Sequence, residues 1–478
     1  MENKMKIVFI QSDPFTRVGI MSMSACLKKS GHKVDLFIAS EEKNLIEQLK
    51  KIQPDLIGFS VIAGLERKEI DLAKKIKKEV KSLIIFGGPY VTFYPDEVIN
   101  KDYVDIICLG EGEGAITELL NRLEKGEEII NIKNLWIKNN NKIFKNEIRN
   151  LIEDLDKLPI PDRTIYYKYE FLKNQLSKDF VFFRGCPYNC SFCFNSEFMK
   201  FYYGKGKYVR KKSVKKVIEE IKYVKEKFGL SSLMIYDDLF ILDKKWLKNF
   251  LRIYKKEINL PFNCEVRADL IDEDIVKHLK EANCVTIALG VESGNEHIRN
   301  VLLNKNLSND VIINACKIIK KYRIYLKTYN MVGIPEETLE NALETIEFNI
   351  KLKPDFAWCS VLRIYPKTLI AEDAIKNGFL KKDFKLADFG NSYQLGKTPL
   401  KMKDINKIIN LQRFFSLSVR FPFLLPLIKQ IIKIPSNKFF DFISQINYSF
   451  FTLKTTKIGL KNFLILGMKL KKSLFKND

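Results

Sequence analysis

Three cysteines stand close together near the middle of the chain, Cys186, Cys190 and Cys193, in the segment Cys-Pro-Tyr-Asn-Cys-Ser-Phe-Cys. Spacings of four and three residues place three thiols on one tight loop. Three thiolates can hold three corners of an iron–sulfur cluster and leave one iron open to a substrate or cofactor. The alternative is a structural zinc loop completed by a distant cysteine, although zinc sites more often show paired Cys-x2-Cys knuckles with four ligands.

The other six of the nine cysteines are scattered along the 478 residues, and we expect them to be ordinary residues of the apolar core. The first apolar run, Ile7–Ile10, is only four residues long, which is too short for a secretory signal. No uninterrupted apolar stretch approaches the ~20 residues that span a bilayer. We therefore expect a cytoplasmic protein with reduced thiols and no disulfide framework.

The first part of the chain alternates apolar strand patterns with polar stretches of helical spacing, such as Arg67–Val80. This pattern predicts a Rossmann-like parallel α/β domain over residues 1–150. Several of the expected strands end in small or turn-forming residues, in loops that contain Ser60, Gly87, Gly88, Glu111 and Gly112. Such loops border the ligand crevice of open α/β sheets, so a bulky cofactor could lie there. The expected strands are Lys6–Ile10, Lys33–Ile38, Leu56–Val61, Leu83–Phe86 and Val104–Leu109.

The stretch Leu158-Pro159-Ile160-Pro161 cannot continue a helix, because proline lacks the amide hydrogen and pushes the preceding residue into an extended conformation. We place an inter-domain linker at residues 151–175. A second alternation follows and predicts a partial (β/α)6 barrel, similar to a TIM barrel, over residues 176–380. Its expected strands are Phe180–Phe183, Leu233–Tyr236, Phe262–Val266, Val285–Val291, Tyr325–Val332 and Phe356–Ile364.

Polar or turn-forming residues follow each expected barrel strand. In barrels of this kind, residues at the C-terminal strand ends carry chemistry, whereas the others carry packing. We therefore expect these residues to converge on one mouth of the barrel. They are Arg184-Gly185-Cys186, Asp237-Asp238, Arg267, Glu292-Ser293-Gly294, Gly333-Ile334-Pro335 and Tyr365-Pro366.

The net charge of +23 is concentrated near the end of the chain, where residues 401–478 hold 15 Lys or Arg against three acidic residues. We expect residues 381–478 to form a basic helical region that serves either as cover for the barrel or as an amphipathic surface on anionic lipid. The second alternative would make the protein peripheral to the inner face of the membrane. Nucleic acid is disfavoured as a partner, because no binding module is recognised. The aromatic and basic residues concerned are Phe414, Phe415, Phe421, Phe423, Phe439, Phe440, Lys429, Lys433 and Lys438.

The cysteine spacing, with Phe192 directly before the third cysteine, resembles the radical S-adenosylmethionine (SAM) superfamily. Further stretches resemble, in order, the branch with an N-terminal cobalamin (B12)-binding domain, which includes anaerobic Mg-protoporphyrin IX monomethyl ester cyclases and cobalamin-dependent radical SAM methylases. These stretches are Phe86–Pro89, Leu109–Glu113, Leu158–Arg163, Asp237–Phe240, Leu289–Gly294 and Gly333–Thr338.

The resemblance implies that Cys186, Cys190 and Cys193 hold a 4Fe–4S cluster whose open iron binds SAM. An electron from the reduced cluster then cleaves SAM to a deoxyadenosyl radical, and the protein supplies orientation and electrostatics. For each other residue carried over, the alternative is an ordinary loop residue or ion pair, and no catalytic residue is assigned. The resemblance implies that Phe192 flanks the cluster, that Asp237 and Asp238 bind the SAM ammonium, that Arg267 pairs with the SAM carboxylate, that Glu292 accepts hydrogen bonds from ribose or ammonium, and that Gly333 contacts adenine through its backbone.

Cobalamin binding follows only from the resemblance. Relatives with a histidine ligand to cobalt show Asp-x-His-x-x-Gly after the first strand, whereas this chain has Asp13-Pro14-Phe15-Thr16-Arg17-Val18-Gly19. The three histidines, His32, His278 and His297, are expected on the surface or in packing. The resemblance therefore implies cobalamin bound without a histidine ligand and contacted by Ser60, Gly87, Gly88, Glu111 and Gly112. The alternative is an α/β domain that has lost the cofactor.

Two residues depart from the pattern of the branch. Glu336 stands where relatives often have glycine, and Lys367 interrupts the usual Tyr-Pro-Gly-Thr turn at Tyr365 to Thr368. Both alter loop shape on the substrate side, so the substrate cannot be transferred by analogy.

These observations predict a radical SAM enzyme that methylates an unactivated carbon of a small-molecule or lipid-like substrate with the help of cobalamin. Flavodoxin or ferredoxin would donate the electron. The first alternative is a radical SAM oxidoreductase or cyclase without methyl transfer. The second is a zinc-stabilised, non-enzymatic scaffold that binds membrane or nucleic acid.

Overall fold

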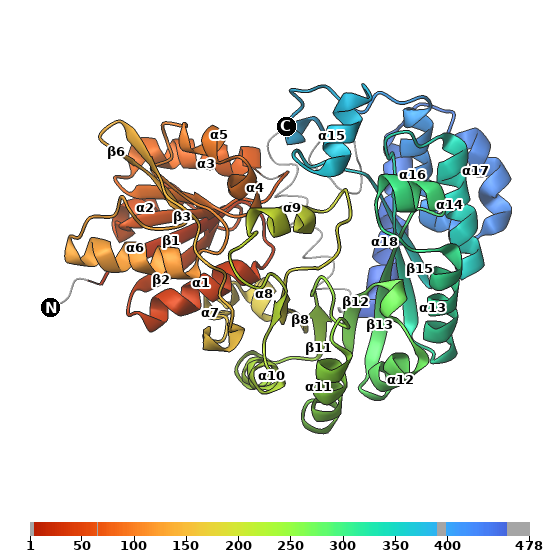
Figure 1. The fold of residues 1–478 in the computed structure, drawn as a ribbon, viewed down its shortest axis with the longest axis horizontal. Helices are drawn as coiled ribbons and strands as arrows, with labels where there is room; N and C mark the ends of the chain where they lie inside the picture. Colours follow the sequence, from red (N-terminus) through yellow and green to blue (C-terminus); the bar gives the residue numbers. More distant parts are fainter. Residues whose placement is uncertain (1–3, 65, 390–397, 457–478) are drawn as a thin grey trace. The chain divides into compact units, whose positions relative to one another are not determined.

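A computed structural model describes residues 4–64, 66–389 and 398–456 of the chain. Within this part, the residues form two compact units, one of residues 4–175 and 204–207 and one of residues 176–203 and 208–456. Figure 1 shows a sheet with flanking helices in each unit. The two units are described separately below.

The first unit is built on a seven-stranded sheet in the order β2-β1-β3-β4-β5-β6-β7, in which β1 to β5 are parallel. The chain order reverses between β1 and β3, which makes the carboxyl ends of these two strands the switch point at which ligands bind in such sheets. The strands are β1 (Lys6–Gln11), β2 (Lys33–Ile38), β3 (Leu56–Ser60), β4 (Leu83–Gly87), β5 (Ile106–Cys108), β6 (Leu135–Asn139) and β7 (Lys142–Lys145). The helices are α1 (Val18–Lys29), α2 (Leu45–Ile52), α3 (Glu66–Glu79), α4 (Pro89–Phe93), α5 (Pro95–Ile99), α6 (Glu113–Lys125), α7 (Thr164–Tyr167) and α8 (Glu170–Lys173).

An antiparallel hairpin that the sequence analysis did not predict extends this sheet beyond β5. Its strands β6 and β7 are joined by Asn140 and Asn141, whose φ angles are 49° and 60°. Two consecutive residues with positive φ are the requirement of a tight two-residue hairpin turn, and asparagine tolerates them. The sheet is therefore parallel at its centre and antiparallel at one edge.

Residues 151–175, which we expected to be a linker, belong to the first unit. Tyr166 is fully buried and donates from its hydroxyl to Gln11 at 2.6 Å, at the end of β1. The Tyr169 hydroxyl accepts from the Ile38 amide at the end of β2. The prolines do interrupt helical structure, but the apolar and aromatic residues that follow pack against the sheet.

The second unit is built on a six-stranded sheet in the order β15-β14-β13-β12-β11-β8, and every pairing in it is parallel. Together with the helices between the strands, this sheet confirms the predicted fold class, a Rossmann-like sheet domain followed by a partial (β/α)6 barrel and C-terminal helices. The strands are β8 (Ser177–Phe180), β9 (Phe183–Arg184), β10 (Arg210–Lys211), β11 (Ser232–Ile235), β12 (Phe262–Val266), β13 (Cys284–Glu292), β14 (Tyr325–Val332) and β15 (Phe356–Val361). The helices are α9 (Phe194–Phe201), α10 (Val214–Phe228), α11 (Lys244–Glu257), α12 (Glu273–Glu281), α13 (Asn309–Lys321), α14 (Leu339–Leu352), α15 (Leu369–Lys376), α16 (Ile405–Arg420), α17 (Leu425–Ile431) and α18 (Lys438–Thr456).

The first barrel strand differs from the expected Phe180–Phe183, because β8 ends at Phe180. The amides of Phe182 and Phe183 donate to the carboxylate of Asp237, at 2.6 and 2.9 Å, instead of to a neighbouring strand. The chain then enters the short strand β9, which pairs antiparallel with β10. A buried side chain therefore ends the strand that the apolar pattern alone would extend.

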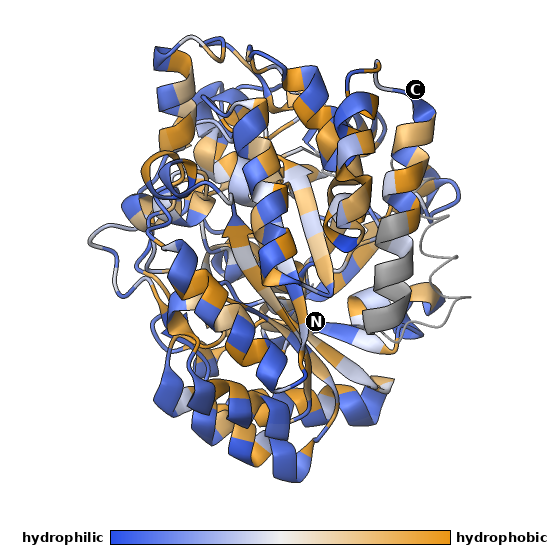
Figure 2. Ribbon diagram, turned by 90° about the vertical axis from the view of Figure 1, so that its right-hand side faces the viewer, coloured by the Kyte–Doolittle hydropathy of each residue, from blue (hydrophilic) through white to orange (hydrophobic). Residues whose placement is uncertain are grey.

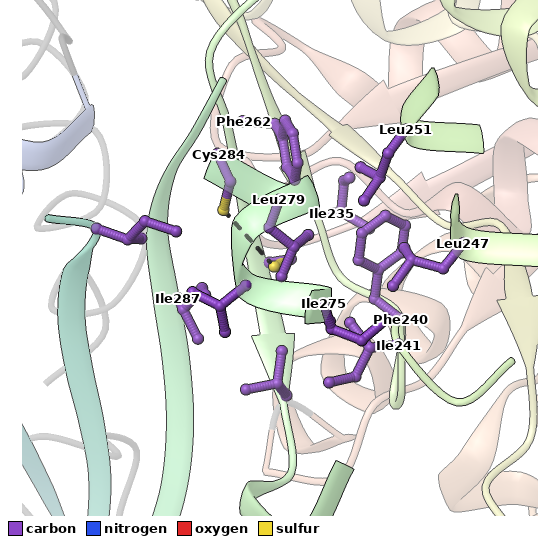
Figure 3. Packing of buried hydrophobic residues seen from close by; sticks show 14 of the residues in the cluster. Ile235, Phe240, Ile241, Leu247, Leu251, Phe262, Ile275, Leu279, Cys284 and Ile287 are labelled. Carbon is purple, nitrogen blue, oxygen red and sulfur yellow. Dashed lines mark hydrogen bonds between the residues drawn. The ribbon is translucent and has the colours of Figure 1, made fainter. Parts of the chain in front are cut away.

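Helices α10 to α13 begin at residues that suit a helix N-terminus. Ser213, Asp243, Asp272 and Ser308 each accept a hydrogen bond from a backbone amide in the first turn of the helix that follows. The helices place their apolar residues against one face of the sheet. Figure 3 shows this packing, with Leu247 and Leu251 of α11 and Ile275 and Leu279 of α12 against Ile235, Phe262 and Ile287 of the strands.

The C-terminal helices cover the sheet near β15. Phe414 and Phe415 of α16 and Phe440 of α18 are buried in one apolar cluster with Ala357 and Cys359 of β15. Hydrophobic and hydrophilic residues alternate in bands along the helices in Figure 2, as expected for helices with one buried face. No helix in the described part of the chain is long and apolar enough to cross a membrane.

Candidate functional site

The cysteine loop follows β9 and leads into α9. Cys186, Cys190 and Cys193 are all partly exposed, and the Cys193 amide donates to the Cys190 carbonyl at 3.1 Å, which closes a tight turn. Gly185, directly before the loop, has a φ of +85°, and a Cβ atom there would lie 2.6 Å from the Tyr208 carbonyl oxygen. Only glycine fits this position, so the chain approaches the loop with a fixed direction.

The surroundings of the loop shift the pKa values of its thiols in two directions. Burial raises the pKa of all three thiols, that of Cys186 to about 12, and neighbouring cysteines further raise the pKa of Cys186 and Cys193. Lys305 and Arg267 lower the pKa of Cys190 in part. None of the nine cysteines forms a disulfide. Three reduced thiols on one loop, next to two cations, are donors that suit an iron–sulfur cluster, because bound iron takes the place of the thiol protons.

Among the described residues, no three His, Cys, Asp or Glu side chains converge closely enough to hold one metal ion.

Asp237 and Asp238, which follow β11, lie in different surroundings. Asp237 is fully buried, and burial raises its pKa to about 7 although it accepts the two amide hydrogen bonds described above. It holds the segment that leads to the cysteine loop. Asp238 is exposed, and its charge contributes to the raised pKa of Cys186. Of the two carboxylates, Asp238 is thus the one with access to a cation beside the cysteines.

Arg267, at the end of β12, is buried and held by protein groups. Its Nε lies 2.9 Å from Asp269, an Nη donates to the Lys305 carbonyl, and the guanidinium stacks 3.8 Å from the centre of the Tyr188 ring. Tyr188 belongs to the cysteine loop. Arg267 therefore joins this loop to the loop that follows β13.

Glu292 ends β13 in a strained conformation with a φ of 66°, at an irregularity in the register with β14. Its carboxylate forms an ion pair of 2.5 Å with Lys305, and both side chains are nearly buried. The ion pair passes over Gly290, where a Cβ atom would lie 2.5 Å from Lys305 Nζ. Non-glycine residues with positive φ persist mainly where function or surrounding structure requires them.

Gly333 follows β14 with a φ of +74°. Its amide and that of Ile334 donate to the carboxylate of Glu337, at 2.5 and 3.3 Å. Glu337 is almost fully buried, and burial raises its pKa to about 8. These two amides are thus already engaged, so a contact with adenine would use other backbone groups of the loop.

Phe192 is partly buried and packs against an apolar cluster that includes Leu303 and Ile334. The structure therefore brings Asp238, Arg267 and Glu292 to the same end of the sheet as the three cysteines, whereas Asp237 and Phe192 support the loop from within. Lys305 and Tyr188 also belong to this site, although the sequence analysis did not predict them as site residues. Lys305 follows no strand pattern, and its partners Glu292 and Arg267 come from other strands.

In the first unit, the predicted cofactor contacts lie at the carboxyl ends of three adjacent strands. Ser60 ends β3 and pairs in register with Gly87, which ends β4, and Glu111 and Gly112 follow β5. At Gly88, with a φ of +96°, a Cβ atom would lie 2.7 Å from the Val61 carbonyl oxygen. The backbone approaches itself so closely there that only glycine fits, at the end of the sheet where ligands bind in such folds.

The loop after β1 presents an aromatic residue in place of the histidine found in histidine-ligated relatives. Phe15 is 50% exposed. Asp13 is committed to an ion pair with Arg17, and Arg17 also donates to the Ser60 carbonyl and lies 3.4 Å from Glu69. His32 lies at the opposite edge of the sheet, before β2, where it hydrogen-bonds to Asn121 at 2.9 Å. The glycine-lined strand ends and the exposed apolar side chains of Phe15 and Ile62 fit a corrin ring that has no histidine ligand.

Comparison with known proteins connects both units to characterised families. A family model described as the radical SAM superfamily matches residues 180–348, and one described as a B12 binding domain matches residues 12–120. An uncharacterized methyltransferase of Pyrococcus horikoshii is 31% identical over 336 residues, which are 70% of this chain and 72% of that protein. The anaerobic magnesium-protoporphyrin IX monomethyl ester cyclase of Cereibacter sphaeroides is 25% identical over 73% of this chain and 59% of its own length.

Two solved structures share the fold. The radical SAM methyltransferase TsrM from Kitasatospora setae, with cobalamin and a 4Fe–4S cluster bound, has a TM-score of 0.65 at 14% identity and covers 78% of this chain and 75% of its own. The cobalamin-dependent SAM radical enzyme OxsB with aqua-cobalamin bound has a TM-score of 0.70 at 16% identity, over 99% of this chain and 80% of its own. The cysteine loop, the glycine-lined strand ends and these matches lead to one conclusion: the chain belongs to the radical SAM superfamily, in the branch that carries an N-terminal B12-binding domain.

Proposed function

We propose that this chain catalyses cobalamin-dependent radical methylation of an unactivated carbon. The observation that carries the proposal is the joint presence, in one chain, of a three-thiol loop at the carboxyl end of a parallel barrel sheet and a second sheet with glycine-lined strand ends. When bound, the 4Fe–4S cluster supplies the electron that cleaves SAM, and cobalamin supplies a carrier for the methyl group. As for radical SAM enzymes in general, we expect a small-molecule substrate and an electron donor.

Different residues of the second unit would hold the cluster and SAM. Cys186, Cys190 and Cys193 would ligate the cluster, with Phe192 packed beneath their loop. Asp238 would face the SAM ammonium, because it is the exposed carboxylate beside Cys186. Asp237 would position the chain instead.

Arg267 and Glu292 would act from existing ion pairs. Arg267 is held by Asp269 and Glu292 by Lys305, so each would exchange or share its partner when SAM binds. Gly333 would shape the adenine side of the site through its loop. Contacts from Ser60, Gly87, Gly88, Glu111 and Gly112 to cobalamin would complete the cofactor set.

Anaerobic purification with metal and cofactor analysis tests this function. We expect a brown protein that contains iron, sulfide and cobalamin and that forms both 5′-deoxyadenosine and S-adenosylhomocysteine from SAM under reductant. Deoxyadenosine without S-adenosylhomocysteine would support the alternative of an oxidoreductase or cyclase without methyl transfer. A colourless protein loaded with zinc would reject both enzymes in favour of a scaffold.

We also propose that the turn Pro422–Leu424, α17, the segment that follows it and the start of α18 rest on an anionic lipid surface. Phe414, Phe415 and Phe440 serve as barrel cover, but Phe423, Phe439 and Leu427 are 77%, 63% and 57% exposed. Lys429, Lys433 and Lys438 lie between Leu427 and Phe439 in the sequence. Each lysine near anionic lipid contributes ~1 kcal/mol, and the apolar side chains add burial.

Sedimentation with vesicles tests the lipid contact. We expect the protein to bind vesicles of phosphatidylcholine and phosphatidylglycerol more strongly than vesicles of phosphatidylcholine alone, and high salt to weaken this binding. The double change Phe423→Asp, Leu427→Asp should abolish it, whereas Tyr203→Asp, at an exposed aromatic residue elsewhere, should not. Equal binding of both variants would contradict the proposal.

A further inference from the structure

The two faces of the six-stranded sheet have opposite character. Phe262, Cys264 and Val266 of β12 and Leu326 of β14 lie on the face that the helices cover. Because successive side chains of a strand point to opposite faces, Glu265, Lys327 and Tyr329 lie on the other, concave face. This is the inner face of the open barrel, and the cysteine loop lies at the carboxyl end of the same sheet.

Strand register brings Glu265 and Lys327 into one row of this concave face. Glu265 is opposite Ala288, and Ala288 is opposite Lys327. The alanine between them is small, so the space between the two charged side chains is not filled by the intervening strand. One row closer to the mouth, Tyr329 is opposite both Gly290 and Trp358, and the Tyr329 and Trp358 rings pack at right angles with centroids 5.6 Å apart.

Glu265 and Lys327 both hydrogen-bond to the hydroxyl of Tyr329. Tyr329 donates from its hydroxyl to Glu265 Oε1 at 2.9 Å, and Lys327 Nζ donates to the same hydroxyl at 3.3 Å. Nζ also lies 4.5 Å from the centre of the Tyr329 ring. The Glu265 and Lys327 groups are therefore close, yet they form no direct ion pair, because no carboxylate of the described residues lies within 4 Å of Lys327.

Each charged group keeps unused hydrogen-bonding capacity. An ammonium has three donors, and the described residues give Lys327 no acceptor other than the Tyr329 hydroxyl. Glu265 receives one hydrogen bond, at one of its oxygens. Burial lowers the pKa of Lys327 to about 8 and raises that of Glu265. Partly buried charges with unused hydrogen-bonding capacity cost free energy unless a ligand satisfies them.

We propose that Glu265, Lys327 and Tyr329 form a substrate-orienting site for a molecule that carries an ammonium and an anionic group close together, as at the end of an amino acid. The free Glu265 oxygen would accept from the ammonium and the free Lys327 donors would bind the anion, while Trp358 would flank the remainder of the molecule. A ligand with only an anionic group would be repelled by the Glu265 carboxylate, and a ligand with only an amine would be repelled by the Lys327 ammonium. The proposal deepens the proposed function and rests on it, since the substrate is taken to bind at the inner face of the six-stranded sheet.

Calorimetric binding to the anaerobically purified protein tests the site. SAM without reductant is kept in excess, so that its own site is filled, and each of the common L-amino acids is titrated in turn. The tightest binder is then compared with its two analogues that lack the amino or the carboxylate group. In the wild type, we expect either loss to weaken binding at least tenfold.

Variants should separate the two halves of the site. In Lys327→Met, removal of the carboxylate from the ligand should no longer matter, and in Glu265→Gln, removal of the amine should no longer matter. Lys327→Arg should retain the preference for the carboxylate. Lys321→Met and Glu281→Gln remove the same charges from exposed positions on α13 and α12 and should behave as the wild type.

The proposal is overturned if no amino acid binds, if the analogues bind as well as the parent, or if both variants keep both dependences. Failure of the proposed function is seen separately, because it would appear as absence of deoxyadenosine and S-adenosylhomocysteine whether or not amino acids bind.

Discussion

The three cysteines differ from the other six in what surrounds their sulfur atoms. Cys264 and Cys284 lie 4.0 Å apart in the apolar cluster between the sheet and its helices (Figure 3), whereas the loop cysteines are partly exposed and Cys190 lies near Lys305 and Arg267. A cysteine in an apolar core is inert, and one near cations is prepared to lose its proton to a metal.

Replacement of Cys190 therefore tests the loop. Cys190→Ala should reduce SAM cleavage to background and iron content sharply, with little change in thermal stability, because the side chain is partly exposed. Deoxyadenosine formation and iron analysis measure this. Cys264→Ala and Cys359→Ala, at buried positions, should keep iron and cleavage. Retained cleavage in Cys190→Ala would overturn its assignment as a ligand.

The lowered pKa of Lys327 predicts a pH dependence of binding. Lys327 is charged below a pH of about 8 and loses its proton above it, so affinity for the analogue without the amino group, whose carboxylate stays charged, should fall about tenfold per pH unit above 8. Glu265 and Tyr329 face the ammonium and are its titratable neighbours. Titration calorimetry from pH 6.5 to pH 9.5 measures the fall. Lys327→Arg should show none, and a fall of equal steepness in that variant would assign it to another group.

The spacing of the cysteines in the sequence was enough to predict the cluster ligands, because all three lie within eight consecutive residues. It could not locate Lys305 or the cluster of Glu265, Lys327 and Tyr329. These residues come from different strands, and their meeting depends on register, which no local pattern of β12 to β14 contains. Likewise, Asp237 and Asp238 are equivalent in sequence, and only burial shows that the first binds backbone amides.

At the scale of elements, two loops near the barrel mouth have backbone strain. It lies at the two residues whose types differ from those usual in the cobalamin-binding branch. Glu336 and Lys367 both have a φ of 68°, in the left-handed region that glycine enters freely. This explains why relatives often have glycine there. The backbone shape is thus retained although the residue has changed.

Restoring glycine should therefore stabilise the second unit. A left-handed non-glycine residue costs roughly 1–2 kcal/mol, and the extra freedom of glycine in the unfolded chain takes back roughly half, so Glu336→Gly and Lys367→Gly should each add about 0.5–1 kcal/mol. Thermal unfolding measures the gain. Glu340→Gly, within α14, should instead destabilise by about 1 kcal/mol. Equal loss in all three would show that the side chains matter more than the backbone.

Most elements could be predicted, since their apolar periods are clear, but their ends depended on side chains from elsewhere. Asp237 ends β8, and the Asn140-Asn141 turn creates a hairpin whose strands are too short and polar to stand out. The predicted linker became part of the first unit because the hydroxyls of Tyr166 and Tyr169 hydrogen-bond to residues at the ends of β1 and β2. Residues 457–478 of the predicted C-terminal region lie outside the described residues.

At the scale of the whole molecule, the two cofactor sites belong to separate units with separate cores. Loss of one cofactor should therefore leave the other in place. Gly88→Ala should reduce cobalamin content severalfold, because the new Cβ would lie 2.7 Å from the Val61 oxygen, and should leave iron unchanged. Absorption spectra and metal analysis measure both. Gly126→Ala, with a similar φ of +67° but open space around it, should keep cobalamin. Joint loss of both cofactors would show that the units depend on each other.

The sheet of the second unit begins at β8 and ends at β15, and these two strands do not pair with each other. A closed barrel has its circumference fixed by strand number and shear. An arc of six strands has no such constraint, so small changes in twist can widen or narrow its interior without breaking a single interstrand bond.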